Sequence, residues 1–295
     1  MLLNTYNPGK FAFSKSLHNL KEIKKDDVAW AIIGVPFDST SSYHTGSRYS
    51  PLVIREASRS FEKYNISFDK EIDGNFFDFG DINVINGNCN KTSEIIENTV
   101  DELLFLGLRP LLVGGEHSIS YPVVKRLIKE VDMGELTVIH FDAHMDMMDM
   151  YQGEKCSHAT VMRRIHELNP KNILQLGIRS SSKEEYEFVK NKESIKQFYS
   201  NDFNNIDPIK REILDIEGPI YLSIDCDVFD PAYLPSVGNP VPNGISPNDM
   251  ETLLKLIAKK NIIGFDIVEV STNVLGDISA LTAAKVIYDF LTLIE

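Results

Sequence analysis

The chain has 295 residues, of which 43% are hydrophobic and 25% are charged, a composition typical of globular proteins. Its formal net charge of −13 argues against a nucleic-acid partner, because phosphate backbones are bound by clustered Lys and Arg side chains. The N-terminus does not resemble a signal peptide and no apolar run approaches the roughly 20 residues that cross a bilayer, so we expect a cytoplasmic protein without a membrane partner.

Apolar, β-rich segments recur along the chain and predict eight strands, at residues 28–35, 76–79, 110–113, 136–141, 172–178, 195–199, 219–224 and 262–268. Segments of helical character lie between them, at residues 91–106, 118–131, 158–168, 182–192, 247–259 and 280–293. Continuous apolar strands separated by helices are typical of a parallel sheet that is covered on both faces. Because no linker, repeat or low-complexity segment interrupts the pattern, we expect a single three-layer α/β/α domain over residues 1–295, with a mostly parallel sheet of roughly eight strands.

Four of the predicted strands are followed directly by polar side chains. In chain order these are His117, the segment Asp142-Ala-His144-Met-Asp146, the segment Asp225-Cys-Asp227, and Glu269. Ligand sites in parallel sheets form at the carboxyl ends of the strands. We therefore expect the four groups to converge on one edge of the sheet.

The spacing within these segments points to metal binding. Side chains alternate along an extended chain, so Asp225 and Asp227 share one face while Cys226 points into the opposite helical layer. The same alternation applies to residues 142–146 while the chain stays extended. Together with His117, these segments offer four carboxylates and two imidazoles, a set that suits Mn²⁺ or a similar divalent ion and lacks the thiolates of a structural zinc site.

The number of ligands and their charge favour two ions over one. Six ligands are too many for a single catalytic ion that must keep an open position, whereas two ions can share carboxylates. Two divalent ions also balance the four negative charges, which makes the burial of the aspartates tolerable. A lone buried histidine is more often a hydrogen-bonded core residue, and a lone strand-end aspartate is more often a helix cap. Asp-x-His-x-Asp and Asp-x-Asp motifs that each follow an apolar strand are much harder to explain as caps or core residues.

The three cysteines, Cys89, Cys156 and Cys226, are too few and too scattered to predict a disulfide framework or a Cys-x-x-Cys metal site. Their odd number is typical of a reducing compartment. We therefore expect no part for thiol chemistry in this chain.

Three segments of the chain resemble the signature segments of the ureohydrolases, the family of arginases, agmatinases and formimidoylglutamases. They are Gly-Gly-Glu-His117-Ser, Phe-Asp142-Ala-His144-Met-Asp146 and Ser-Ile-Asp225-Cys-Asp227-Val-Phe-Asp-Pro-Ala. Segments at residues 34–38, 46–48, 51–55, 157–159 and 268–271 also match in order, so the resemblance covers most of the chain. It implies an arginase-like fold, a hydrolase with two Mn²⁺ per chain, and a homo-oligomer, commonly a trimer or hexamer.

The resemblance also implies how the ligands are divided. By matching position, Asp142 and Asp225 bridge the two ions, His117 and Asp146 complete one site, and His144 and Asp227 complete the other. Such a metal pair lowers the pKa of water and thereby supplies a nucleophile for attack on a guanidinium carbon.

Three residues are expected to take part in catalysis. Glu269 is not needed as a ligand, and a carboxylate at this edge can hold a planar guanidinium cation by charge-assisted hydrogen bonds. Asp146 can relay a proton. His158 matches a family histidine that lies outside the metal ligands, and it can deliver that proton to the leaving amine.

The identity of the guanidino substrate is less closely specified. Arginases recognise the amino-acid end of arginine partly through an Asn after the Asp-x-His-x-Asp motif, and residues 147–158 contain none. An acidic protein without an obvious basic clamp for a carboxylate favours the dication agmatine, which would yield putrescine and urea. However, the loop at residues 236–244 departs from the agmatinase pattern and lacks an acidic residue expected near the substrate. Guanidinobutyrate, N1-aminopropylagmatine, arginine and formimidoylglutamate therefore stay as alternatives.

Two other classes of function can be compared with this hypothesis. A zinc-dependent deacetylase or amidase on the same general fold would hold one ion, and His117 and Asp146 would then be superfluous. A catalytically silent binding protein would not need the complete set of six ligands together with His158 and Glu269. The number of metal ions per chain separates the first alternative from a binuclear hydrolase.

Overall fold

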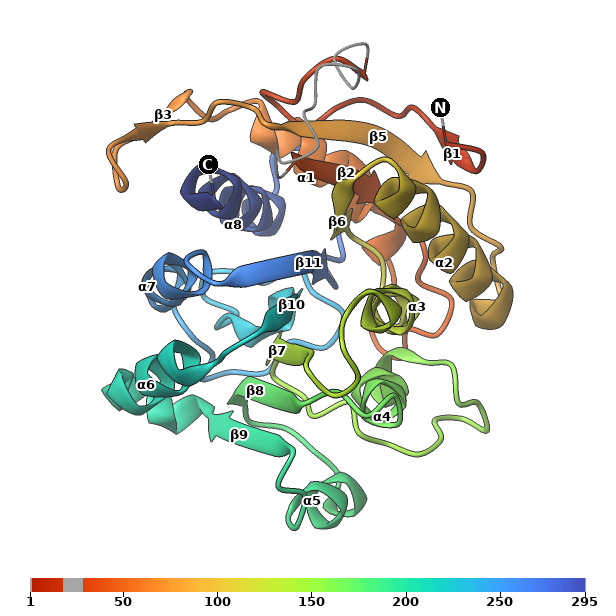
Figure 1. Cartoon of the computed structure of the whole chain (residues 1–295), viewed down its shortest axis with the longest axis vertical. Helices are drawn as coiled ribbons and strands as arrows, with labels where there is room; N and C mark the ends of the chain where they lie inside the picture. Colours follow the sequence, from red (N-terminus) through yellow and green to blue (C-terminus); the bar gives the residue numbers. More distant parts are fainter. Residues whose placement is uncertain (1, 18–28, 295) are drawn as a thin grey trace.

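The computed structural model describes residues 2–17 and 29–294, and through this part of the chain runs a sheet of nine strands. The strand order is β1-β5-β2-β6-β11-β10-β7-β8-β9, and helices cover both faces (Figure 1). Neighbouring strands are parallel except at one edge, where β1 pairs antiparallel with β5. The mostly parallel α/β/α architecture predicted from the sequence is therefore confirmed.

Each of the eight predicted strands is present, although Val28 lies outside the described residues. The strands of the sheet are β1 (Thr5–Tyr6), β2 (Ala29–Gly34), β5 (Phe76–Ile82), β6 (Leu108–Val113), β7 (Thr137–Phe141), β8 (Asn172–Ile178), β9 (Ile195–Tyr199), β10 (Pro219–Asp225) and β11 (Asn261–Val268). A separate pair, β3 (Tyr64–Asn65) and β4 (Lys70–Glu71), forms a small antiparallel ribbon.

Strand β5 runs further than predicted because the carboxylates at its end are neutralised inside the protein. Asp78 and Asp81 are both buried. The guanidinium group of Arg55, itself 2% exposed, contacts Asp78 at 2.8 Å and Asp81 at 2.5 Å. A buried ion pair of this kind allows charged residues to continue a strand that their polarity alone would end.

Within the described residues, four α-helices lie on each face of the sheet, and Figure 1 shows the two helical layers. One face carries α1 (Ser50–Ser58), α6 (Asp207–Asp215), α7 (Pro247–Ile257) and α8 (Ile278–Ile294). The other carries α2 (Cys89–Phe105), α3 (Ser120–Leu127), α4 (Val161–His166) and α5 (Lys183–Val189). Helices α1 and α6 were not predicted, because each has only nine residues and begins with a proline in its first turn, which is also typical of a loop. Among the described helices, none is long and apolar enough to span a membrane.

The core has two apolar layers, one on each side of the sheet. Strand β7 shows how they are built, since Ile139 and Phe141 pack into one layer and Val138 into the other. A central strand buried on both faces needs apolar residues at nearly every position, which accounts for the continuous apolar runs in the sequence.

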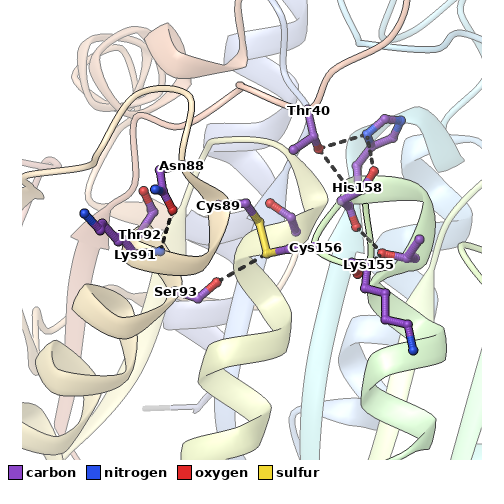
Figure 2. Close-up of a disulfide and its surroundings, with 12 residues drawn as sticks. Thr40, Asn88, Cys89, Lys91, Thr92, Ser93, Lys155, Cys156 and His158 are labelled. Carbon is purple, nitrogen blue, oxygen red and sulfur yellow. Dashed lines mark hydrogen bonds between the residues drawn. A yellow bond between two sulfur atoms is a disulfide. The ribbon is translucent and has the colours of Figure 1, made fainter. Parts of the chain in front are cut away.

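One pair of cysteines is joined, which makes the expectation from the cysteine count wrong. Cys89, the first residue of α2, forms a disulfide with Cys156, 67 residues further along the chain (Figure 2). Cys226 is buried and has a free thiol. Sequence spacing could not predict the bond, because it depends on how the start of α2 meets a loop on the same face of the sheet.

Candidate functional site

The four polar segments surround one cavity of about 250 Å³. Strands β6, β11, β10 and β7 are consecutive neighbours in the sheet, and their carboxyl ends therefore lie side by side. Lining the cavity are His117, His144, Asp146, His158, Asp225, Asp227 and Glu269. Asp142 lies directly beneath it and is 0% exposed.

The first cluster is centred on His117. Its Nδ1 atom lies 3.1 Å from Asp142 Oδ2, 3.1 Å from Asp146 Oδ2 and 3.2 Å from Asp225 Oδ2. Although fully buried, Nδ1 makes no directed hydrogen bond to any of the described residues. A buried ring nitrogen that faces three carboxylate oxygens without bonding to one of them fits a metal ligand.

The second cluster is centred on His144, and it shares a residue with the first. His144 Nδ1 lies 2.9 Å from Asp227 Oδ2 and 3.5 Å from Asp142 Oδ1. Asp142 thus presents one oxygen to each histidine. Ligand atoms of Asp142, His144 and Asp227 all lie within 4.8 Å of one another, as do those of His117, Asp142 and Asp146. Two groups that share a carboxylate fit a pair of divalent ions.

The ligand side chains do not come together by the alternation along an extended strand that the sequence suggested. Asp146 has φ 54°, so the extended chain that was assumed through residues 142–146 has ended before this residue. Asp227 lies in a 3-10 helix, Cys226–Val228, that begins directly after β10. Asp146 and Asp227 both line the cavity, and the Asp227 amide donates to Asp225 Oδ1 at 2.8 Å.

Without metal, the carboxylates are neutralised by the histidines. Burial alone would lower the pKa of His117 and of His144, but the facing carboxylates more than offset it. The pKa of His117 is raised well above its ordinary value, and that of His144 is raised to about 12. Burial and the nearby charge of Asp142 raise the pKa of Asp146 to about 7. Metal binding must therefore displace protons.

A row of polar side chains crosses the sheet directly below the site, and none of them was predicted as functional. We call this set the polar row: Asp266, Ser223, His140, Gln175 and Gln197, which are paired in register on β11, β10, β7, β8 and β9. The first four are 0% exposed. The first four interrupt strands that are mostly apolar, and this interruption was the available signal, whereas Gln197 follows Lys196 in a partly exposed strand.

One end of the polar row sets the orientation of His117. Ser223 donates its hydroxyl proton to Asp266 Oδ1 at 2.7 Å, so its oxygen accepts from His117 Nε2 at 2.9 Å. With its proton on Nε2, a neutral His117 has a free lone pair on Nδ1, the atom that faces the three carboxylates. Such partners orient ligand histidines in metalloproteins.

The other end of the polar row sets the role of His140. Gln197 donates to Gln175 Oε1 at 2.8 Å, which turns the Gln175 amide nitrogen towards His140 Nδ1 at 3.0 Å. His140 therefore carries its proton on Nε2 and donates it to Asp142 Oδ2 at 2.8 Å. Although His140 lies within reach of the first cluster, it holds Asp142 in place and is not free to be a ligand.

Glu269 lies at the cavity wall after β11 with φ 69°. Its Oε1 accepts the His117 amide at 2.8 Å. Its Oε2 lies against Gly238, where an added Cβ would come within 2.6 Å of it. Burial and the neighbouring Glu116 raise the pKa of Glu269 well above its ordinary value.

His158 lies at the cavity wall and outside both ligand groups. Its Nδ1 is 3.2 Å from Thr40 Oγ1, and its Nε2 is 3.4 Å from Ser42 Oγ. Burial, with the positive charges of His117 and His144, lowers the pKa of His158 to about 4. The segment that carries it is attached to α2 by the disulfide at Cys156, two residues earlier (Figure 2).

The loop at residues 236–244, which departs from the agmatinase pattern, packs against the same cavity. Val237 bridges to Val270 just after Glu269, and Asn239 lines the cavity. The guanidinium group of Arg179 holds the loop by donating to the carbonyl oxygen of Val241 at 2.8 Å.

Comparison with known proteins gives a consistent result. Residues 28–292 match the model of the Arginase family. The chain is 40% identical to an agmatinase of Bacillus anthracis over 245 residues, 81% of this chain and 82% of the relative. It is 37% identical to an N(1)-aminopropylagmatine ureohydrolase of Thermococcus kodakarensis over 270 residues, covering 90% and 91%. The crystal structure of the agmatine ureohydrolase of Thermoplasma volcanium superposes with a TM-score of 0.84 at 31% identity, covering 97% and 94%.

Proposed function

Because this chain belongs to the arginase family of hydrolases, which act on C–N bonds of guanidino and related amidine groups, we propose that it converts agmatine into putrescine and urea. The observation that carries the proposal is the position of Glu269. Its carboxylate faces the same cavity as both ligand clusters and is not a member of either. A cation bound by Glu269 would therefore lie close to a nucleophile activated at the two clusters.

The residues of the two clusters fit a pair of Mn²⁺ ions. His117 and Asp146 would hold one ion, His144 and Asp227 would hold the other, and Asp142 and Asp225 would bridge them. Carboxylate-rich sites with some imidazole suit manganese. When bound, the metal pair lowers the pKa of water and so supplies a nucleophile at neutral pH.

Glu269 would bind and orient the guanidinium group. Its Oε1 accepts the His117 amide, so Oε2 is the oxygen left for a planar cation, and a charge-assisted hydrogen bond there would fix the direction of the reacting carbon. Burial and the negative charge of Glu116 raise the pKa of Glu269 more than the neighbouring His117 lowers it. A bound guanidinium would supply the missing positive charge.

His158 and Asp146 would transfer the proton that the leaving amine needs. As the bond between the guanidinium carbon and the chain nitrogen breaks, its electron pair goes to that nitrogen, which takes a proton from His158. Asp146 would relay this proton from the attacking water. The low pKa of His158 fits a group that is neutral at rest and gives up a proton readily once it has received one.

The composition of the cavity wall supports a substrate without a carboxylate. Of the described residues that line it, none is Lys or Arg, and Glu185 adds a further buried carboxylate. Arginine, guanidinobutyrate and formimidoylglutamate would each bring an unpaired carboxylate into this wall, which is costly. N1-aminopropylagmatine carries only positive groups and is our second candidate, because the Thermococcus kodakarensis relative is named for it.

The test is a substrate panel with Mn²⁺-loaded protein. We expect the highest kcat/KM with agmatine or N1-aminopropylagmatine, and weak turnover of the three carboxylate substrates, measured as urea or, for formimidoylglutamate, formamide. A preference for arginine would contradict the proposal. Elemental analysis of the same sample should find about two ions per chain. Full activity with one ion would favour the deacetylase or amidase alternative.

A trimer or hexamer and a cytoplasmic location stay predictions. Light scattering on the purified protein measures the first, and fractionation of the source cells measures the second.

A further inference from the structure

Two nitrogen atoms of His158 lie within hydrogen-bond distance of the same oxygen atom. The His158 backbone amide donates to Thr40 Oγ1 at 3.1 Å, and the ring Nδ1 lies 3.2 Å from that atom (Figure 2). Whether Nδ1 donates to this hydroxyl or accepts from it depends on the position of the hydroxyl proton. The position of this proton depends on the other hydrogen-bonding partner of the Thr40 hydroxyl.

The other side of Thr40 is occupied by Glu116, which is 0% exposed. Glu116 Oε2 accepts the backbone amides of Thr40 at 2.6 Å and Ser41 at 3.1 Å. Glu116 Oε1 accepts the hydroxyls of Ser118 at 2.7 Å and Thr40 at 2.5 Å. With four donors around it, this carboxylate acts as an acceptor on both oxygens.

A hydroxyl group has one proton and two lone pairs. Since the Thr40 proton is directed to Glu116, only lone pairs face His158, and one of these already accepts the backbone amide. Nδ1 can interact with the remaining lone pair only as a donor. The Ser157 hydroxyl lies farther from Nδ1, at 3.4 Å, and its oxygen can accept a share of the same N–H group. The neutral ring therefore carries its proton on Nδ1 and has a bare Nε2.

We propose that Thr40 and Glu116 are positioning residues that fix neutral His158 in the Nδ1–H tautomer, so that Nε2 is the atom that exchanges protons with the reaction. Nε2 is the ring nitrogen near Ser42, which lines the cavity. This inference rests on the proposed role of His158 in proton transfer.

The consequence for the reaction follows from the two ring nitrogens. Nε2 accepts one proton and returns it to the nitrogen of the leaving amine, while the Nδ1 proton stays bonded to Thr40 throughout. Without the Thr40 hydroxyl, the neutral ring is free to hold its proton on Nε2. In that tautomer no lone pair faces the cavity, and the ring cannot take up the proton that it must deliver.

The first test compares Thr40→Val, which removes the hydroxyl at nearly the same volume, with Thr40→Ser, which keeps it. In Mn²⁺-loaded protein we expect Thr40→Val to lower kcat with agmatine by about 10- to 100-fold, a part of what a general acid–base group contributes. KM and metal content should stay within about twofold. Thr40→Ser should restore kcat to within a few-fold of the parent. Equal kcat in both variants would overturn the inference.

The second test reads the tautomer itself, by long-range ¹H–¹⁵N spectra of metal-free protein labelled at its seven histidines. The His158 signals are assigned by their loss in His158→Asn. We expect a protonated Nδ1 and a bare Nε2 in the parent and in Thr40→Ser, and a mixed or reversed tautomer in Thr40→Val. A bare Nδ1 in the parent would mean that Glu116 holds the proton, and it would overturn the inference.

The kinetics of His158→Asn separate the inference from the function on which it rests. If His158→Asn leaves kcat unchanged, the proposed proton transfer by His158 fails. If that variant is slow but Thr40→Val matches the parent in kcat and tautomer, only the role of Thr40 fails.

Discussion

Gly238 is a residue whose missing side chain matters to the site. Its backbone is outside the left-handed region, so glycine is not required there for its conformation. An added Cβ would lie 2.6 Å from Glu269 Oε2, the flexible end of a side chain. We expect Gly238→Ala to displace the Glu269 carboxylate and lower kcat/KM for agmatine by about 10²-fold, with little change in melting temperature or metal content.

A double-mutant cycle checks the cause of that loss. In a Glu269→Gln background, where the charge that we propose holds the guanidinium is already absent, Gly238→Ala should have little further effect. If the two losses simply add, Gly238 acts on something other than Glu269.

Ser223 should govern metal affinity through His117. Ser223→Ala removes the acceptor of the His117 Nε2 proton and should weaken Mn²⁺ binding by roughly 10- to 100-fold in a calorimetric titration. Ser120→Ala is the matched control, since the Ser120 hydroxyl lies 3.5 Å from that of Ser223 and belongs to the same buried cluster. Equal losses in both variants would point to a packing defect instead of an oriented ligand.

The sequence located the candidate ligands because they come directly after apolar strands, where the carboxyl ends of a parallel sheet must meet. It did not locate the polar row. Ser223 and Gln175 lie in the middle of strands and read there as isolated interruptions. Only the register between strands, which depends on contacts distant in sequence, reveals that they form one connected set.

Among the elements, α2 and the loop before His158 are coupled by a bond that no local pattern indicates. The Cys89–Cys156 disulfide closes a loop of 67 residues, and a cross-link of that span contributes on the order of 4 kcal/mol by restricting the unfolded chain. Both cysteines are partly exposed and open to a reductant. We expect dithiothreitol to lower the free energy of unfolding by an amount of this order, measured by urea denaturation.

The control for this measurement is the Cys89→Ser/Cys156→Ser double variant, which retains the buried free thiol of Cys226. Its stability should be lower than that of the oxidised parent and insensitive to dithiothreitol. A parent protein that unfolds at the same urea concentration with and without reductant would contradict a stabilising bond.

Strands were predicted better than helices for a physical reason. A strand buried on both faces, such as β2 with the sequence Ala-Trp-Ala-Ile-Ile-Gly, must be apolar at nearly every position, and the sequence shows this directly. Helices α1 and α6 are short, and their stability comes from packing on the sheet more than from their own residues. The edge strand β1 has two residues, too few for any periodic pattern.

For the molecule as a whole, metal content should be linked to pH. In the metal-free state His144 has a pKa of about 12 and His117 one well above its ordinary value, so both are protonated near pH 7. Each must lose its proton to bind an ion, and protons therefore compete more strongly as the pH falls. We expect Mn²⁺ affinity to rise steadily between about pH 6 and 9.

Calorimetry in buffers of different ionisation enthalpy should detect about two to three protons released per metal pair near pH 7, because His117 and His144 each lose one and Asp146, with a pKa of about 7, is partly protonated. The bound ions should also raise the melting temperature, and a chelator should reverse the increase, because they bind the folded chain alone. Affinity that does not vary with pH would mean that the histidines are already neutral before the metal arrives.

The polar row also bears on how the chain finds its fold. Parallel apolar strands of similar composition can pair in shifted registers at little cost in burial, whereas Ser223, His140 and Gln175 each have a hydrogen-bonding partner only in the native register. A slip of one residue would turn the polar side chain of that strand to the other face, and a slip of two would separate it from the partner that it has in the native register. The residues that orient the candidate metal ligands therefore also discriminate against misaligned sheets, so the accuracy of the site and the uniqueness of the fold depend on the same five side chains.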